Sequence, residues 1–253
     1  MLSQGVIEPE TSEWASPIVL VPKPDGSLRF CVDYRRLNAI TVPDTYPLPR
    51  MDECIDSLGD AAIFTTLDCN SGYWQIPVRP EDRDKTTFTS HQGIFRFRRL
   101  PFGLRKAPAT FQRAIDVILS RVKWRTCLVY LDDVIIFSPD RASHLRHVHE
   151  ALTLLRQAGL SLKLKKCRFF SQTVDYLGHV IRPGRLGVAE KNTESLRNAK
   201  LPRTQTELRS FLGLCNVYRR FVPRFSTLAA PLNRYLTKGQ PPILGQLTDD
   251  AVD

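Results

Sequence analysis

The fold of this chain is decided by one stretch, Cys127-Leu128-Val129-Tyr130-Leu131-Asp132-Asp133-Val134-Ile135-Ile136-Phe137. Two short apolar runs flank a pair of aspartates, which is the pattern of two strands joined by a tight turn. Aspartate tolerates the backbone conformations that such a turn requires. We therefore expect a β-hairpin that presents the carboxylates of Asp132 and Asp133 at its tip.

Adjacent carboxylates repel each other unless a cation lies between them. Hard cations such as Mg²⁺ prefer oxygen ligands. In nucleotidyl transfer, two such ions about 3.5–4 Å apart hold the attacking and leaving oxygens. A polar turn with solvated aspartates explains the motif equally well, so the motif alone leaves both interpretations open.

A second strand also ends in a carboxylate. Residues 63–68 read as a strand that finishes at Asp68, and Asn70, Ser71 and Gly72 then break it. If this strand lies beside the hairpin, Asp68 comes within reach of the cations that Asp132 would bind. Two sites with the same pattern favour nucleotidyl transfer over coincidence.

A further hairpin is predicted near the N-terminus. Residues 18–22 and 28–33 are β-rich, and the Pro-Asp-Gly turn at 24–26 separates them. Lys23 and Arg29 flank the tip and could fold over a triphosphate. Such residues also protect exposed strand edges, which is the alternative interpretation.

Periodic apolar residues predict helices over 107–118, after a Pro/Gly loop, and over about 143–158. A capping box at 204–207 starts a third helix. Three histidines near the start of the second helix lack cysteine partners, and we expect them at the surface: His144, His147 and His149.

One face of the third helix carries Arg209, Gly213, Asn216 and Arg220 at steps of four, three and four. Such a stripe is suited to lie along a nucleic-acid groove, because the glycine lets the backbone approach closely. An ordinary helix surface with one glycine of low helix propensity is the alternative.

Composition limits the class of protein. The 253 residues are 42% hydrophobic, contain six cysteines without a C-x-x-C pair and carry a net charge of +10. We expect a globular intracellular protein without a membrane span, secretion signal, zinc site or redox motif. Residues 163–238 hold 16 basic and 4 acidic residues. This concentration suggests binding to a phosphate backbone, although a solvated basic face would look the same.

In this order, the motifs resemble the reverse transcriptase of Ty3/Gypsy-type LTR retrotransposons. The resemblance covers about residues 5 to 238. In this family the reverse transcriptase starts further upstream and continues into a ribonuclease H domain, so the resemblance implies that the chain is a fragment of the polyprotein. The matching segments are 14–21, 31–38, 46–50, 67–68, 71–73, 101–104, 107–112, 130–133, 176–179 and 208–214.

The resemblance implies an α+β right-hand fold of fingers, palm and thumb, with an antiparallel palm sheet and a helical thumb. Residues 1–60 and 79–98 would form the fingers, and residues 61–78 and 99–182 the palm. Residues 183–239 would form the thumb and connection. The last segment, 240–253, would be the truncated start of a ribonuclease H region, so we expect no ribonuclease H activity.

The resemblance also implies site residues. Asp68, Asp132 and Asp133 would be the catalytic carboxylates and would hold two Mg²⁺ ions, which Mn²⁺ could replace. Five residues would bind the nucleotide: Lys23, Arg29, Tyr73, Phe102 and Lys166. Tyr73 would be the steric gate that excludes a ribose 2′-OH. Lys166, or Lys165 as the weaker candidate, would donate a proton to the leaving pyrophosphate. The primer grip would comprise Tyr176, Leu177, Gly178 and His179, and the stripe of the third helix would follow the duplex.

The activity thus implied is an RNA-directed DNA polymerase that extends a primer on an RNA or DNA template with dNTPs. It would work in the cytoplasm or nucleus, beside the rest of the polyprotein if the reading frame is intact. Arg96, Arg98 and Arg99 would add template contacts. Alternatives are an inactive remnant that only binds nucleic acid, and an RNA-templated RNA polymerase, against which Tyr73 argues.

Overall fold

The structure is a computed structural model that describes residues 1–22, 26–188, 194, 197–199 and 201–236. The chain divides into two compact units, Met1–Val174 and Asp175–Asp253. Within the described residues, no helix combines the length and the apolar character needed to cross a membrane.

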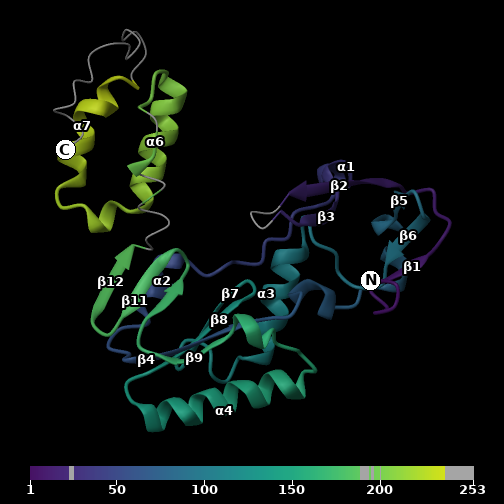
Figure 1. Ribbon diagram of the computed structural model, residues 1–253, viewed down its shortest axis with the longest axis horizontal. Coiled ribbons are helices and arrows are strands. Elements are labelled where there is room, and N and C mark those ends of the chain that lie inside the picture. The colour runs from purple at the N-terminus through teal and green to yellow at the C-terminus, as the bar shows by residue number, and fades with distance from the viewer. Residues whose placement is uncertain (23–25, 189–193, 195–196, 200, 237–253) are drawn as a thin grey trace. The chain divides into compact units, whose positions relative to one another are not determined.

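The central sheet of the first unit has four antiparallel strands (Figure 1). Its order is β7 (Cys127–Tyr130), β8 (Asp133–Ser138), β4 (Ile63–Asp68) and β9 (Arg168–Ser171). Both the hairpin and the strand ending at Asp68 are therefore confirmed. The sheet pairs segments far apart in sequence, so β4 becomes the direct neighbour of β8.

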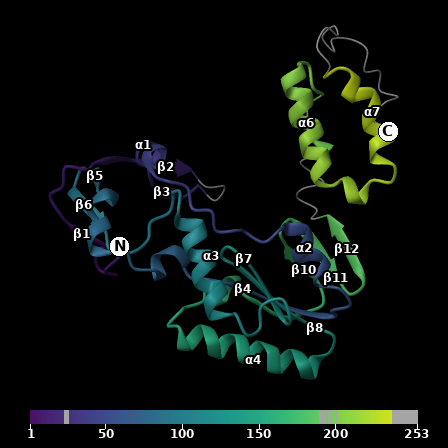
Figure 2. The same ribbon diagram turned by 180° about the vertical axis from the view of Figure 1, so that it is seen from behind.

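Helices α3 (Ala107–Ile118) and α4 (Arg141–Gln157) pack with the central sheet in one core. Figures 1 and 2 both show α4 running along the sheet. Val134 and Ile136 contribute to this core. Side chains alternate along a strand, so Asp133 lies on the sheet face opposite these two residues. The apolar side chains drive this packing, at roughly 1.5–3 kcal/mol for each large one buried.

Helix α4 begins two residues earlier than predicted. The side chain of Asp140 caps it by accepting hydrogen bonds from the backbone amides of Ala142 and Ser143, both at 2.9 Å. The expectation of surface histidines is right for His149, which is exposed, and wrong for His144, which is fully buried.

Two hydroxyl groups explain why His144 is buried. Its Nε2 lies 2.8 Å from Thr65 Oγ1, and its Nδ1 lies 2.8 Å from Ser138 Oγ. Ser138 Oγ also contacts His147 Nδ1 at 2.8 Å. The imidazole thus joins α4 to β4 and β8, a role that helical spacing could not indicate because its partners are remote in sequence.

A second sheet of the first unit contains the N-terminal hairpin. Its order is β1 (Ile7–Pro9), β6 (Gly93–Phe97), β5 (Phe88–Ser90), β2 (Ser16–Pro22) and β3 (Leu28–Val32). Strands β2 and β3 pair antiparallel, as predicted. Lys23, at the tip, lies outside the described residues.

Shorter helices connect these sheets. They are α1 (Arg35–Ile40), α2 (Met51–Asp56) and 3-10 turns at Gly72–Gln75, Pro80–Asp82, Asp84–Thr86 and Leu164–Lys166.

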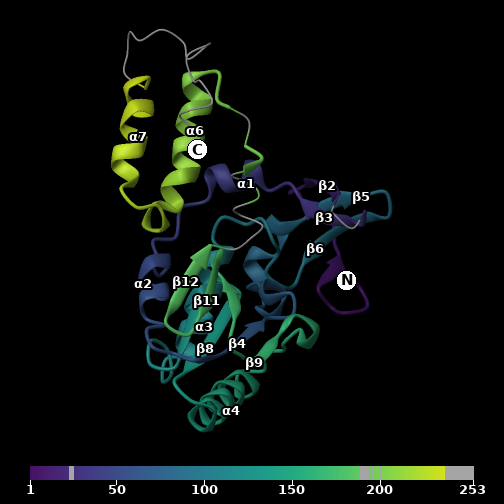
Figure 3. The ribbon, with the colours of Figure 1, turned by 60° about the vertical axis from the view of Figure 1, so that its left-hand side comes forward.

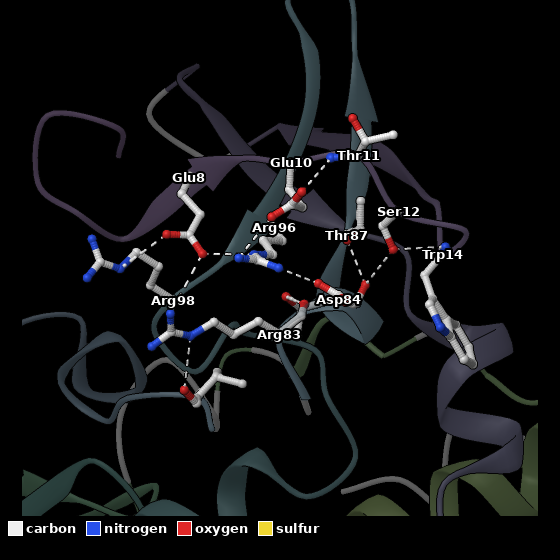
Figure 4. Close-up of polar contacts among 12 residues, drawn as sticks. Glu8, Glu10, Thr11, Ser12, Trp14, Arg83, Asp84, Thr87, Arg96 and Arg98 are labelled. Carbon is white, nitrogen blue, oxygen red and sulfur yellow. Dashed lines mark hydrogen bonds and ion pairs between the residues drawn. The ribbon is translucent and has the colours of Figure 1, made fainter. Parts of the chain in front are cut away.

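Arg96 is the centre of an ion-pair network that ties β1 to β6 (Figure 4). It pairs with Glu8 at 2.8 Å, with Glu10 at 2.9 Å and with Asp84. Arg98 pairs with Glu8 at 3.4 Å. The charge of Arg96 is thus paired within the protein, whereas Arg98 and Arg99 are exposed. Template contacts by these arginines stay a prediction.

The second unit combines a small sheet with helices. The antiparallel strands β11 (His179–Arg182) and β12 (Arg185–Val188) follow β10 (Val174–Tyr176), whose first residue belongs to the first unit. Helices α6 (Gln205–Val217) and α7 (Phe225–Arg234) lie side by side (Figures 1 and 3).

The predicted capping box starts α6, but its second hydrogen bond is donated by the amide of Arg203 and not by that of the cap residue Thr204. The Glu207 amide donates to Thr204 Oγ1 at 3.2 Å, as expected. The Glu207 carboxylate accepts from the Arg203 amide at 2.7 Å, one residue before the cap. The helix ends at Val217, so Arg220 lies in a following 3-10 turn and does not continue the helical stripe.

The buried imidazole predicts a pH-dependent stability. Burial, and to a lesser extent the neighbouring His147, lowers the pKa of His144 to about 4 from a usual 6.5. The unfolded chain therefore binds more protons between these values, and stability falls as the pH falls. When the pH falls from 7.5 to 5, the shifted pKa of His144 should lower the free energy of unfolding by about 2 kcal/mol.

Urea unfolding of wild type and His144→Gln at both pH values checks this, because carboxylates that titrate elsewhere contribute equally to both proteins. We expect the wild type to lose more stability than the variant on acidification. Equal losses would show that His144 does not titrate as its burial requires.

Candidate active site

The tip of the β7–β8 hairpin is a two-residue turn formed by Leu131 and Asp132. Tyr130 and Asp133 are paired across the ladder immediately beside it. Leu131 has a φ of 55°, the left-handed region that a non-glycine residue seldom adopts. The sequence correctly predicted a tight turn, but it assigned the unusual conformation to the aspartates and not to the leucine.

The register of β4 against β8 places Asp68 directly opposite Asp133. Directly paired residues have their side chains on the same face of a sheet. Both carboxylates therefore lie on the face opposite the α3 and α4 core, at the end of the sheet where the turn with Asp132 is. The predicted convergence of two separate chain segments is present in the backbone.

A lysine connects this cluster electrostatically. Lys166 Nζ donates to Asp68 Oδ2 at 2.9 Å, and this hydrogen bond raises the pKa of the lysine. Asp132 and Asp133 raise the pKa of Lys166 further, so one ammonium group lies within the electrostatic range of all three carboxylates. In this structure Lys166 is a counter-ion of Asp68. Lys165 forms no such pair within the described part of the chain.

The carboxylates fit a divalent cation by their chemistry. They offer only oxygen donors, which Mg²⁺ and Mn²⁺ prefer, and they come from one end of one sheet. Within the described residues, no three His, Cys, Asp or Glu side chains are already grouped tightly enough to hold a metal ion. The backbone therefore supplies the convergence, and a bound cation would have to draw the side chains together.

An aromatic group lies next to the carboxylates. The ring centroid of Tyr73 is 4.9 Å from that of Phe102 and 5.4 Å from that of Phe111. Burial, and secondarily the charge of Asp132, raises the pKa of the Tyr73 hydroxyl. The two predicted nucleotide residues, Tyr73 and Phe102, are thus in contact.

The backbone before Tyr73 determines where its ring can go. Ser71 is in the left-handed region with a φ of 49°. At Gly72 a Cβ atom would lie 2.9 Å from Cζ of Phe111, whose side chain is fully buried. Glycine is therefore required here because α3 packs against the turn.

Sequence reasoning missed two residues near the turn. Gln112 Oε1 accepts a hydrogen bond from the Leu131 amide at 2.6 Å. Cys167 Sγ is 3.5 Å from the Asp68 amide. Gln112 is the last residue of the matching segment 107–112 and a polar residue on the buried side of an otherwise apolar helix, but neither signal assigned it a role. Nothing in the local sequence distinguished Cys167.

The predicted triphosphate residue Arg29 is exposed in β3, where it pairs with Val21. Lys23 lies outside the described residues. The first unit therefore shows Asp68, Asp132, Asp133 and Lys166 together at one end of the sheet.

The residues predicted to form a primer grip make a tight turn in the second unit. Leu177 and Gly178 join β10 to β11 with φ values of 48° and 81°. His179 Nδ1 contacts the Leu177 carbonyl at 3.0 Å. The His179 ring also packs near Phe221, with centroids 5.5 Å apart, which connects this turn to the end of the α6 region.

Helix α6 presents Arg209, Gly213 and Asn216 to solvent. A Cβ atom at Gly213 would meet nothing within 4 Å. Packing within the described structure therefore does not require a glycine at this position.

Comparison with known proteins agrees with this arrangement. Residues 21–181 match the family model described as reverse transcriptase (RNA-dependent DNA polymerase). The chain is 41% identical over 243 residues to the retrovirus-related Pol polyprotein from transposon 297 of Drosophila melanogaster, and 38% identical over 246 residues to that from transposon gypsy. These alignments cover 94% and 95% of this chain, but only 23% and 24% of the relatives.

A similar solved structure is that of the foamy viral protease-reverse transcriptase dRH in complex with double-stranded DNA. It superposes with a TM-score of 0.89 at 29% identity, over 99% of this chain and 44% of that chain. The α+β fold found here is therefore the right-hand polymerase fold, with the antiparallel sheet β7-β8-β4-β9 in the palm and helices in the thumb.

Proposed function

This chain belongs to the reverse transcriptase family, among Ty3/Gypsy-type retrotransposon Pol proteins, and we propose that it is an RNA-directed DNA polymerase. It would join dNTPs to the 3′-OH of a primer that is paired with an RNA or DNA template. The observation that carries the proposal is the pairing of Asp68 with Asp133 next to the Asp132 turn. The chain spans about a quarter of its curated relatives, so the activity of the whole protein is part of the proposal.

Asp68, Asp132 and Asp133 would hold two Mg²⁺ ions, or Mn²⁺ in their place. When bound, the metal ions would activate the primer hydroxyl and neutralise charge on the triphosphate. The protein contributes the fixed strand register that brings the carboxylates to one place. Phosphoryl transfer depends chiefly on such positioning and charge stabilisation.

The surrounding residues would bind and orient the nucleotide. Lys166 has an ammonium group beside Asp68, which suits it to neutralise and protonate the departing pyrophosphate. Tyr73 and Phe102 form one aromatic surface that would lie against the sugar. Lys23 and Arg29 of the β2–β3 hairpin would contact the triphosphate.

The nucleic acid would be held by positioning contacts and not by reading of bases, because base pairing supplies the sequence information. We assign residues 1–60 and 79–98 to the fingers, 61–78 and 99–182 to the palm and 183–239 to the thumb. The turn Tyr176–His179 would support the primer. Arg209, Gly213, Asn216 and Arg220 would follow the duplex, although Arg220 does so from outside α6.

The six free thiols suit a reducing compartment, so we propose that the polymerase works in the cytoplasm or nucleus.

Primer extension tests the function directly. Purified protein with an RNA template, a DNA primer, dNTPs and Mg²⁺ should extend the primer. Asp132→Asn should reduce the rate roughly 100- to 1,000-fold, because it removes charge where the transferred phosphate must be stabilised. Asp60→Asn, an exposed carboxylate change outside the site, should extend normally. Primer binding without any extension by the wild type would contradict the proposal and indicate a remnant that only binds.

Sugar selection tests the aromatic surface. Tyr73→Ala should raise the ratio of ribonucleotide to deoxynucleotide incorporation by about tenfold or more, since the ring that would exclude a 2′-OH is gone. Tyr73→Phe keeps the ring and should keep the selectivity. Both ratios are measured within one protein, so a change in the folded fraction cancels. An unchanged ratio in Tyr73→Ala would show that this tyrosine is not the gate.

Helix α6 offers a variant that separates stability from binding. Gly213→Ala should stabilise the helix by up to about 1 kcal/mol, because alanine fits the open space and has a higher helix propensity. It should weaken template-primer binding about fivefold if the backbone approaches the duplex there. Ser210→Ala, one position off the stripe, should leave binding unchanged. Thermal unfolding and fluorescence anisotropy measure the two effects, and unaltered binding by Gly213→Ala would remove the glycine from the interface.

A further inference from the structure

We propose that Gln112 is the positioning residue for the catalytic turn: it holds Leu131 in its left-handed conformation and thereby orients Asp132 for metal binding. This inference rests on the proposed function of the three carboxylates. It adds a residue from α3 that touches neither the nucleotide nor a metal ion but determines whether the turn is ready to bind one.

The turn needs external support for two reasons. A leucine with a φ of 55° is unfavourable by roughly 1–2 kcal/mol relative to an ordinary conformation. Its amide also lies at the hairpin tip, outside the β7–β8 pairs that end at Tyr130 and Asp133. Without a partner for this N–H group, the peptide before Leu131 could rotate, and Asp132 would move with it.

Gln112 supplies that partner from a rigid position. Its side chain is fully buried, and its Oε1 accepts the Leu131 amide hydrogen at 2.6 Å. Its Nε2 donates to the Val129 carbonyl at 3.2 Å. One amide group thus bonds both the strand leading into the turn and the turn itself, which fixes the angle between them.

A neighbouring carboxylate determines which way the amide faces. Asp116 Oδ1, one helical turn along α3, accepts a second hydrogen bond from Gln112 Nε2 at 2.8 Å. Asp116 is held in turn by Lys123 Nζ at 2.6 Å and by the Tyr46 hydroxyl at 2.7 Å. A carboxylate accepts and does not donate hydrogen bonds, so it keeps the NH₂ group toward itself and Oε1 toward Leu131.

Other residues of similar size cannot replace this amide. Methionine has the length, but its thioether accepts hydrogen bonds only weakly and cannot donate one to the Val129 carbonyl. Asparagine has the amide but is shorter by one methylene, so it cannot reach the turn from the same helix position. Glutamate would place a second negative charge beside Asp116.

Metal binding by the full chain tests the proposal without relying on turnover. Mn²⁺ is titrated into the protein, and the free ion is counted by its electron paramagnetic resonance signal. Wild type should bind Mn²⁺, and Asp132→Asn should bind it weakly. Gln112→Met should weaken binding roughly 10- to 100-fold, the usual effect of losing a group that orients a metal ligand. Gln112→Asn should weaken Mn²⁺ binding to a similar extent, and it replaces Gln112→Met as the test if the methionine variant does not fold.

Ser138→Ala is the matched control. It removes buried hydrogen bonds at the far end of β8, to His144 and His147, and touches nothing at the turn. It should lower the unfolding temperature yet leave Mn²⁺ affinity within about twofold of wild type. Loss of affinity in Ser138→Ala equal to that in Gln112→Met would overturn the proposal, because general loosening would then explain both.

If folded Gln112→Met or Gln112→Asn bound Mn²⁺ with the affinity of wild type, the proposal for Gln112 would also be overturned. The proposed function would still stand in that case if Asp132→Asn bound Mn²⁺ weakly. Mn²⁺ binding that is insensitive to Asp132→Asn would instead contradict the metal role of the carboxylates themselves.

Discussion

The register of β4 against β8 is the constraint on which the candidate site depends. It places Asp68 opposite Asp133, although three 3-10 turns, two strands of the second sheet, helix α3 and strand β7 separate the two residues in the sequence. A slip of one residue would turn Asp68 toward the core and Leu67 away from it. The core packing of Leu67, Val134 and Ile136 against α3 and α4 therefore holds the carboxylates on the outer face. Apolar burial is the force that keeps the acidic groups together.

Three of the six non-glycine residues with positive φ in the described part of the chain lie in the proposed site. Ser71 precedes the proposed gate Tyr73, Leu131 belongs to the proposed catalytic turn and Leu177 to the proposed primer grip, and all three adopt left-handed φ values. Such conformations persist only where surrounding contacts stabilise them. For Leu131 the stabilising contact is Gln112, and packing of α3 against Gly72 fixes the backbone next to Ser71. Helix α3 thus supports two parts of the site at once.

Positive charge serves different purposes in different places. In the first unit, the guanidinium of Arg96 is used internally and binds the edge strand β1 to β6 (Figure 4). On α6, Arg209 lies on a solvent-facing surface beside a glycine that packing does not require. The net positive charge of a segment therefore indicates a polyanionic partner only when its basic residues are exposed and unpaired. Whether they are paired depends on where the carboxylates lie in the fold.

The sequence by itself determined the local elements: the 127–137 hairpin, the strand ending at Asp68, helix α3 and the cap at Thr204, because alternation, helical period and turn residues are properties of neighbouring positions. Only the tertiary structure decided that His144 is buried, that Arg96 is paired, that Lys166 binds Asp68 and that Gln112 holds Leu131. In each of these contacts the partners come from different elements. Periodicity reports which side of an element is apolar, but it contains no information on which remote polar group that side will meet.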